Sequence, residues 1–196
     1  VTLGSFSKKS LEMASQFTGE NYDILLGLNT QKSDGDEFEN ITDQFGNIGE
    51  YSSGLDQMTA IASGAIGQFS FTAFYTDFKA DNGGGLFKLR EQSYYDEKRY
   101  VAVGYQHEIS GNWTVAVSYL YSDQILEWDI NNPRESRQTL DSVENIAEVT
   151  LRGVVMHDVD IVLGSSRSIY KGEFVSSIKP HEIWRQSYFG QVSTMV

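Results

Sequence analysis

The sequence predicts an all-β protein, an antiparallel transmembrane β-barrel of meander hairpins to which this chain contributes about nine strands. Three observations carry this prediction. Apolar and polar residues alternate with period two in several segments, short turns alternate with longer polar connections, and no apolar run is long enough for a transmembrane helix. We treat residues 1–196 as one segment of barrel.

The clearest strand runs from Trp113 to Ser122. Its odd-numbered residues are large and apolar, and its even-numbered residues, Leu120 excepted, are small and mostly polar. Successive side chains of a strand point to opposite faces, so one face is apolar and the other mostly polar. Aromatic residues stand at both ends of the apolar side, which is the order expected of a strand that crosses a bilayer between two aromatic girdles.

The same unit recurs along the chain as hairpins. Short turns are predicted at Thr18–Asn21, Gly64–Gln68, Glu108–Asn112 and His157–Asp160. Long polar connections are predicted at Lys32–Leu55, Ala80–Lys98, Asn131–Ser142 and Lys171–Glu182, and the two prolines, Pro133 and Pro180, fall in the last two. Bacterial barrels show this asymmetry, with short periplasmic turns and long outer loops.

A soluble β-sandwich is the structural alternative. Its strands are short, with turns about every 8 to 12 residues, whereas these alternating segments run longer. Polar residues, two of them charged, also alternate with apolar ones at Glu148, Thr150 and Arg152. An Arg on the lipid face costs about 2 to 4 kcal/mol at mid-bilayer, so these side chains are assigned to the barrel interior.

Composition excludes several classes of function. The net charge of −12 makes a nucleic-acid partner unfavourable, and the absence of cysteine rules out disulfides and thiolate chemistry. The three histidines share no metal-like spacing. No nucleophile elbow or phosphate-binding loop is found, so we predict no catalytic residue, no metal and no cofactor.

Three short motifs carry a resemblance to a known family. Gly4-Ser5-Phe6-Ser7-Lys8-Lys9 is similar to the first barrel strand that follows the plug domain in TonB-dependent outer-membrane receptors. Tyr22-Asp23-Ile24, followed by Ser33-Asp34-Gly35-Asp36 and Asn40, resembles their second strand and first outer loop. Ser187-Tyr188-Phe189-Gly190-Gln191-Val192 resembles a mid-barrel strand. The motifs span the chain, and their order and spacing carry the resemblance.

The resemblance implies a 22-stranded barrel in the bacterial outer membrane, filled by an N-terminal plug. It implies energy-coupled uptake of a scarce nutrient such as an iron-siderophore, haem, cobalamin or an oligosaccharide. The partners would be outer-membrane lipid and lipopolysaccharide, and the TonB energy-coupling complex through a plug not present in this chain. Because the chain shows neither plug nor TonB box, has an odd strand number and ends in Val196, we expect a partial segment of a longer receptor.

Two other functions remain open at this stage. One is a passive porin or small structural outer-membrane barrel, which would close with an even number of strands and no plug. The other is a soluble β-rich binding module, such as a lectin. An enzyme is not expected.

Candidate ligand contacts lie in the long connections: Asp34, Asp36, Tyr94, Tyr95 and Trp128. Aromatic rings could stack on a sugar or on a siderophore ring, and they could equally form the outer aromatic girdle or pack the loops together. The carboxylates near Asp34 could ligate a hard cation such as calcium, although the full spacing of an EF-hand is missing, which favours a solvated acidic loop.

Overall fold

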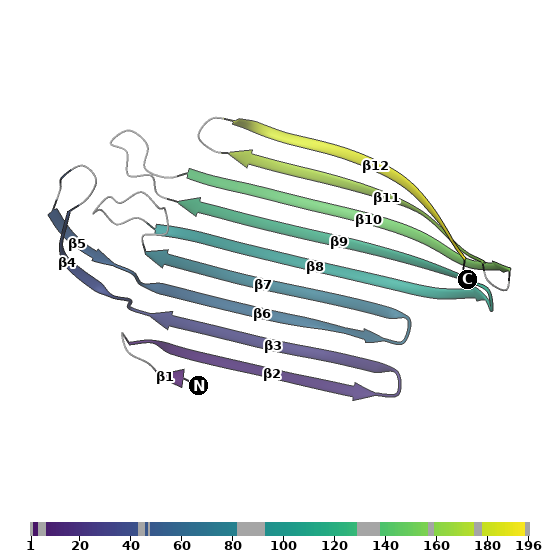
Figure 1. Cartoon of the computed structure of the whole chain (residues 1–196), viewed down its shortest axis with the longest axis horizontal. Helices are drawn as coiled ribbons and strands as arrows, with labels where there is room; N and C mark the ends of the chain where they lie inside the picture. The colour runs from purple at the N-terminus through teal and green to yellow at the C-terminus, as the bar shows by residue number, and fades with distance from the viewer. Residues whose placement is uncertain are drawn as a thin grey trace.

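The computed structural model describes residues 2–3, 7–42, 46, 48–81, 93–128, 138–156, 159–174 and 178–194. They form one antiparallel sheet in the order β1-β2-β3-β6-β7-β8-β9-β10-β11-β12 and a separate hairpin of β4 and β5 (Figure 1). The all-β antiparallel meander is therefore confirmed, and so are its nine long strands. A tenth, two-residue strand is added at the N-terminal edge.

In the large sheet, β8 to β12 are longer, at 16 to 19 residues, than β2, β3, β6 and β7, at 11 to 13 residues. The bounds of all strands are β1 (Thr2–Leu3), β2 (Lys9–Gly19), β3 (Tyr22–Ser33), β4 (Glu37–Thr42), β5 (Ile48–Ser52), β6 (Leu55–Ile66), β7 (Phe69–Asp81), β8 (Ser93–Ser110), β9 (Trp113–Trp128), β10 (Gln138–Met156), β11 (Val159–Phe174) and β12 (Ile178–Thr194). The long pairs are in continuous register, with shifts only near the ends of β8, β10 and β11.

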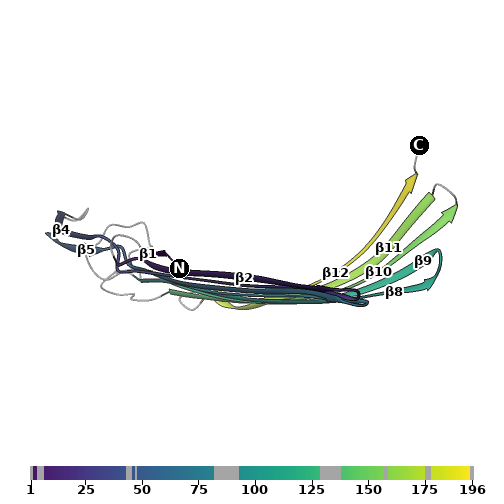
Figure 2. The same cartoon turned by 90° about the horizontal axis from the view of Figure 1, so that it is seen from below.

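Seen from its edge, the sheet is a single layer (Figure 2). It is nearly flat over most of its length, and the turn ends of the later strands curve to one side. Strands β1 and β12 lie at opposite edges, so the described strands do not close into a barrel. None of the described segments is a helix long and apolar enough to span a bilayer.

Three predicted turns are tighter in the structure than the sequence predicts. At Thr18–Asn21, only Glu20 and Asn21 remain between β2 and β3. Strand β6 continues through Ile66, which leaves only Gly67 and Gln68 between β6 and β7. Gly67 has a φ of 57°, a positive value that one common class of two-residue hairpin turn places at its first residue, usually a glycine. Likewise Gly111 and Asn112 alone join β8 to β9. The predicted turn at His157–Asp160 falls partly on residues outside the described part of the chain.

The long connection predicted at Lys171–Glu182 is wrong. Strand β11 extends to Phe174 and β12 begins at Ile178. The two strands stay paired beyond their apolar segments, although both of their faces are polar there. Pro180 consequently lies inside β12. It is tolerated there because β12 is an edge strand and the β11–β12 register shifts between Gly172 and Phe174.

The three other long connections are also shorter than predicted. Strand β10 begins at Gln138, inside the connection predicted at Asn131–Ser142, and Pro133 of that connection lies outside the described residues. The connection predicted at Lys32–Leu55 contains the β4–β5 hairpin. The connection predicted at Ala80–Lys98 is confirmed only in part, because β7 ends at Asp81 and β8 begins at Ser93, which leaves residues 82–92 between them.

Gly64 offers a test of how closely β3 and β6 pack. A Cβ added at Gly64 would collide with the backbone carbonyl oxygen of Asp23, which cannot move without distorting the β3–β6 pair. We expect Gly64→Ala to lower the free energy of unfolding by about 1–3 kcal/mol, as overpacking typically does. The measurement is urea unfolding of the folded protein.

Gly172→Ala is the matched control. Its Cβ would meet only the carbonyl oxygen of Asp141 at 3.9 Å, an ordinary contact. It should leave the unfolding free energy within about 0.5 kcal/mol of the parent. Equal losses for the two variants would contradict the close approach of β3 to β6.

Candidate functional site: the two faces of the sheet

Continuous register assigns every described strand residue to one of two faces. Residues paired across an antiparallel ladder share a face, so Leu26 shares its face with Ala62, Ala73, Val101 and Tyr121. We call this the apolar face. The opposite face carries Glu148, Thr150 and Arg152, as the alternation predicted, and we call it the polar face.

The apolar face carries a continuous belt of large side chains that nothing in the structure covers. No hydrophobic side chain is buried among the described residues; Val117 is 45% exposed, Val149 49% and Leu163 50%. The belt consists of Met13, Phe17, Ile24, Leu26, Leu28, Ile66, Phe69, Phe71, Val101, Val103, Val115, Val117, Tyr119, Val149, Leu151, Ile161, Leu163 and Val192. An exposed apolar surface of this extent indicates an interaction surface.

Aromatic rings bound the belt at the end of the short turns. Phe69 and Tyr105 contact each other with centroids 4.8 Å apart, and Tyr105 stacks on His107, whose Nδ1 lies 3.3 Å from Gln68 Oε1. On the next hairpin, the Trp113 ring covers the space above Gly153, where a Cβ would otherwise stand. Filling a glycine site with a cross-strand aromatic ring is a common stabilising device in sheets.

Tyrosine–carboxylate pairs bound the belt at the other end. The Tyr75 hydroxyl donates to Asp77, and the Tyr121 hydroxyl donates to Asp123, each over 3.4 Å. In both pairs the carboxylate is two residues further from the belt on the same strand. The ring therefore borders apolar surface while the hydroxyl is held by a charged group, as in the interfacial aromatic residues of membrane proteins.

Beyond these tyrosines the apolar face becomes charged. Arg99 lies 3.1 Å from Glu97 and 3.8 Å from Asp123. Two further ion pairs, Lys32–Asp56 at 3.7 Å and Lys171–Glu182 at 3.2 Å, lie on the same face. The apolar face thus divides into an apolar belt near the short turns and an ionic band near the long connections.

The belt runs obliquely across the strands. Tyr22, at its turn-end boundary on β3, is in register with Val117 of β9, whereas the boundary on β9 lies four residues earlier at Trp113. At the opposite boundary, Asp56 of β6 is in register with Glu127, four residues beyond Asp123. Between the first strands of the sheet and β9, both boundaries therefore shift toward the short turns by roughly 13 Å along the strands. From β9 to β12 each boundary stays in one register row.

Side-chain hydrogen bonds connect neighbouring residues on the polar face. Gln124 Nε2 donates to Asp96 over 3.0 Å, and the Thr59 and Thr76 hydroxyls are 3.3 Å apart across β6 and β7. Arg152 pairs with Asp160 at 3.3 Å. No buried polar side-chain atom of the described residues lacks a partner.

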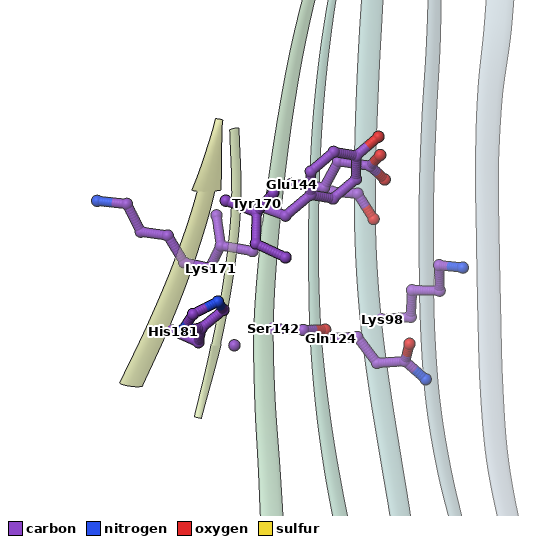
Figure 3. A pocket seen from close by; sticks show the side chains of 11 residues that line it. Lys98, Gln124, Ser142, Glu144, Tyr170, Lys171 and His181 are labelled. Atoms are coloured by element: carbon purple, nitrogen blue, oxygen red, sulfur yellow. The ribbon is translucent and has the colours of Figure 1, made fainter. Parts of the chain in front are cut away.

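A shallow hollow of about 400 Å³ lies on the polar face over β8 to β12 (Figure 3). Its lining includes the small residues Ser122, Ser142 and Gly172, and Lys98 and His181 lie on opposite sides of it. Sequence reasoning missed this hollow, because it arises from small residues of different strands that only the register brings together.

The predicted ligand residues do not form one group. Tyr94 and Trp128 are register partners on the polar face, and Phe78 contacts Tyr94 edge-to-face with centroids 5.8 Å apart. Tyr95 lies on the other face, where its hydroxyl donates to Glu97 and Lys79 lies over its ring. Burial raises the pKa of Tyr94, and burial together with the Glu97 hydrogen bond raises that of Tyr95.

Asp34 and Asp36 lie in the connection after β3. The backbone N–H of Asp36 donates to Ser53 Oγ over 2.9 Å, and its carbonyl accepts from the N–H of Ser53 over 3.1 Å. These bonds join the ends of β3 and β6. The described residues contain no group of three His, Asp or Glu side chains placed to hold a metal ion.

Comparison with known proteins gave no match to a family and none to a curated protein.

The ionic band yields a prediction about its most enclosed cation. Arg99 is half exposed, while the carboxylates of Glu97 and Asp123 are more than four-fifths covered. We expect Arg99→Gln and Asp123→Asn to be coupled by about 0.5–1 kcal/mol in a double-mutant cycle on unfolding free energy.

The Lys32–Asp56 pair is the control, because both of its side chains are more than half exposed. Lys32→Gln and Asp56→Asn should show a coupling near zero. High salt should reduce the Arg99 coupling, and a larger coupling for the Lys32 pair would contradict the assignment.

Proposed function

We propose that this chain forms part of the wall of a bacterial outer-membrane β-barrel, with the apolar face toward lipid and the polar face toward the interior. The observation that carries the proposal is the uncovered apolar belt between two aromatic boundaries. A soluble sandwich would bury such a face against a second sheet, and no second layer covers it among the described residues.

The dimensions of the belt fit a membrane. From Trp113 to Tyr121 the strand advances eight residues, roughly 26 Å at about 3.3 Å per residue. At a tilt of about 40° this becomes roughly 20 Å of height, close to the apolar band of about 25 Å in outer-membrane barrels. The oblique course of the belt has the same origin, because a level belt crosses inclined strands obliquely.

Membership of the TonB-dependent receptor family is the more specific part of the proposal. It rests on the resemblance of three sequence motifs to that family, together with the long antiparallel meander. In such a receptor the polar face surrounds a plug supplied by another part of the polypeptide. Coupling to the TonB complex through that plug would drive uptake of an iron-siderophore, haem, cobalamin or an oligosaccharide.

Two charge substitutions on adjacent residues test which face meets lipid. Val117 lies midway along the belt on β9, so Val117→Arg would place a charge in hydrocarbon at a cost of about 2–4 kcal/mol. We expect the amount of protein assembled in the outer membrane to fall strongly, measured by heat-modifiable gel migration of membrane fractions from cells that express the full-length polypeptide.

Ser118→Arg is the matched control on the polar face, where Ser118 pairs with Glu148. Its assembly should stay close to that of the parent protein. If both variants assemble equally, or if the polypeptide remains soluble without detergent, the membrane-wall proposal is wrong.

Uptake assays can test the predicted ligand contacts. Tyr94→Ala and Trp128→Ala each remove a ring from the polar face and should weaken binding roughly 3- to 10-fold, since an aromatic contact is worth about 0.5–1.5 kcal/mol. Tyr95→Ala, on the opposite face, should leave binding unchanged. The measurement is uptake of labelled ferric siderophores, haem, cobalamin and maltodextrins by cells, and impaired uptake in the Tyr95 variant alone would contradict the assignment.

A further inference from the structure

A cation interrupts the apolar belt on β11. Arg167 of β11 is in register with Ala147 and Gln186, so it points to the same side as the belt. It lies two residues from Ile169, whose register partner Trp184 stands at the loop-end boundary. Arg167 is therefore inside the belt, just below that boundary.

No carboxylate in the described part of the chain neutralises the charge of Arg167. No carboxylate of the described residues lies within ion-pair distance of it, whereas Lys32, Arg99 and Lys171 on this face each have one. Its guanidinium instead lies over the Trp184 ring, 4.7 Å from the centroid. A cation–π contact of this kind orients the group without cancelling its charge.

Arg167 stands at the loop end of a strip of exposed apolar side chains. Gln186 is its register partner and donates to the Tyr188 hydroxyl over 2.5 Å, and Ser165 lies two residues toward the turn end on the same face. The face continues in that direction with Tyr188, 76% exposed, Leu163, 50%, and Val192, 66%. An exposed cation at one end of an exposed apolar strip matches the layout of a lipid, in which a charged headgroup is joined to acyl chains.

We propose that Arg167 binds a phosphate group of a lipid in the outer leaflet, namely the phosphorylated glucosamine headgroup of lipid A, with Leu163, Tyr188 and Val192 against its acyl chains. This inference rests on the proposed membrane function. An arginine exposed to hydrocarbon needs an anion, and its planar fork matches a phosphate with two hydrogen bonds. The site continues the lipid-facing belt, which favours a lipid over a second copy of the chain.

The neighbouring strand supplies a matched control. Arg185 of β12 also lies over an aromatic ring, that of Tyr170 at 5.6 Å, but it is in register with Ser168 and faces the polar side. Arg167→Gln and Arg185→Gln therefore remove the same group from the same kind of contact on opposite faces. Only the first should affect lipid.

The experiment is native mass spectrometry of the full-length polypeptide in detergent, titrated with bis-phosphorylated lipid A and with dephosphorylated lipid A. We expect Arg167→Gln to weaken binding of the phosphorylated lipid about 10-fold, as loss of a charge-assisted bond does. Arg167→Lys should weaken it less, and it serves as the test if the Gln variant does not fold. Arg185→Gln should bind like the parent.

The proposal is overturned if Arg167→Gln binds as tightly as the parent, if Arg185→Gln is weakened equally, or if the dephosphorylated lipid binds as well. Nitroxide labels at Val117 and Ser118 separate this failure from that of the membrane function. Oxygen access at residue 117 with nickel-complex access at residue 118 would uphold the lipid-facing belt while the Arg167 site alone fails. Reversed or equal accessibilities at residues 117 and 118 would contradict both the membrane function and the Arg167 site.

Discussion

The hydrogen-bonded register of the nine long strands is the constraint on which the rest of the structure depends. A strand has a period of two, so a slip of one residue would move its whole apolar set to the opposite face. The pairing keeps Leu26, Val101 and Val149 on one side across the sheet, although no hydrophobic core holds them there. The two-residue turns at Gly67 and Gly111 help to fix this register, because they leave no slack between paired strands.

The same register explains how far the sequence could predict the structure. Alternation was sufficient to find the nine strands and the faces of Val117 and Glu148, because each is a local property of one strand. It was not sufficient where both faces are polar, so the loop ends of β8, β10, β11 and β12 were predicted to be connections. Tyr94 and Tyr95 show the limit at the candidate site: being adjacent in a strand they lie on opposite faces, and Tyr94 meets Trp128 only through the β8–β9 pairing.

Arg167 escaped prediction for a related reason. Its position two residues after Ser165 gives its face, but its significance depends on what lies nearby. Trp184 and Gln186 come from the next strand, and the absence of a carboxylate partner is a property of three strands together. Whether a charged residue on an apolar face has an ion-pair partner thus depends on the register with neighbouring strands, which the sequence of one strand does not reveal.

The free edge of β12 places a further demand on the proposed membrane wall. Its outer backbone N–H and C=O groups have no partner strand in the described sheet, and each unpaired group in hydrocarbon costs several kcal/mol. The part of β12 from Trp184 to Val192 crosses the whole belt, so several of these unpaired groups would lie in hydrocarbon. Their summed cost would exceed the free energy of unfolding of an ordinary domain. A wall that contacts lipid through this face therefore requires a further antiparallel strand along β12, in the register that keeps Tyr188 and Val192 outward.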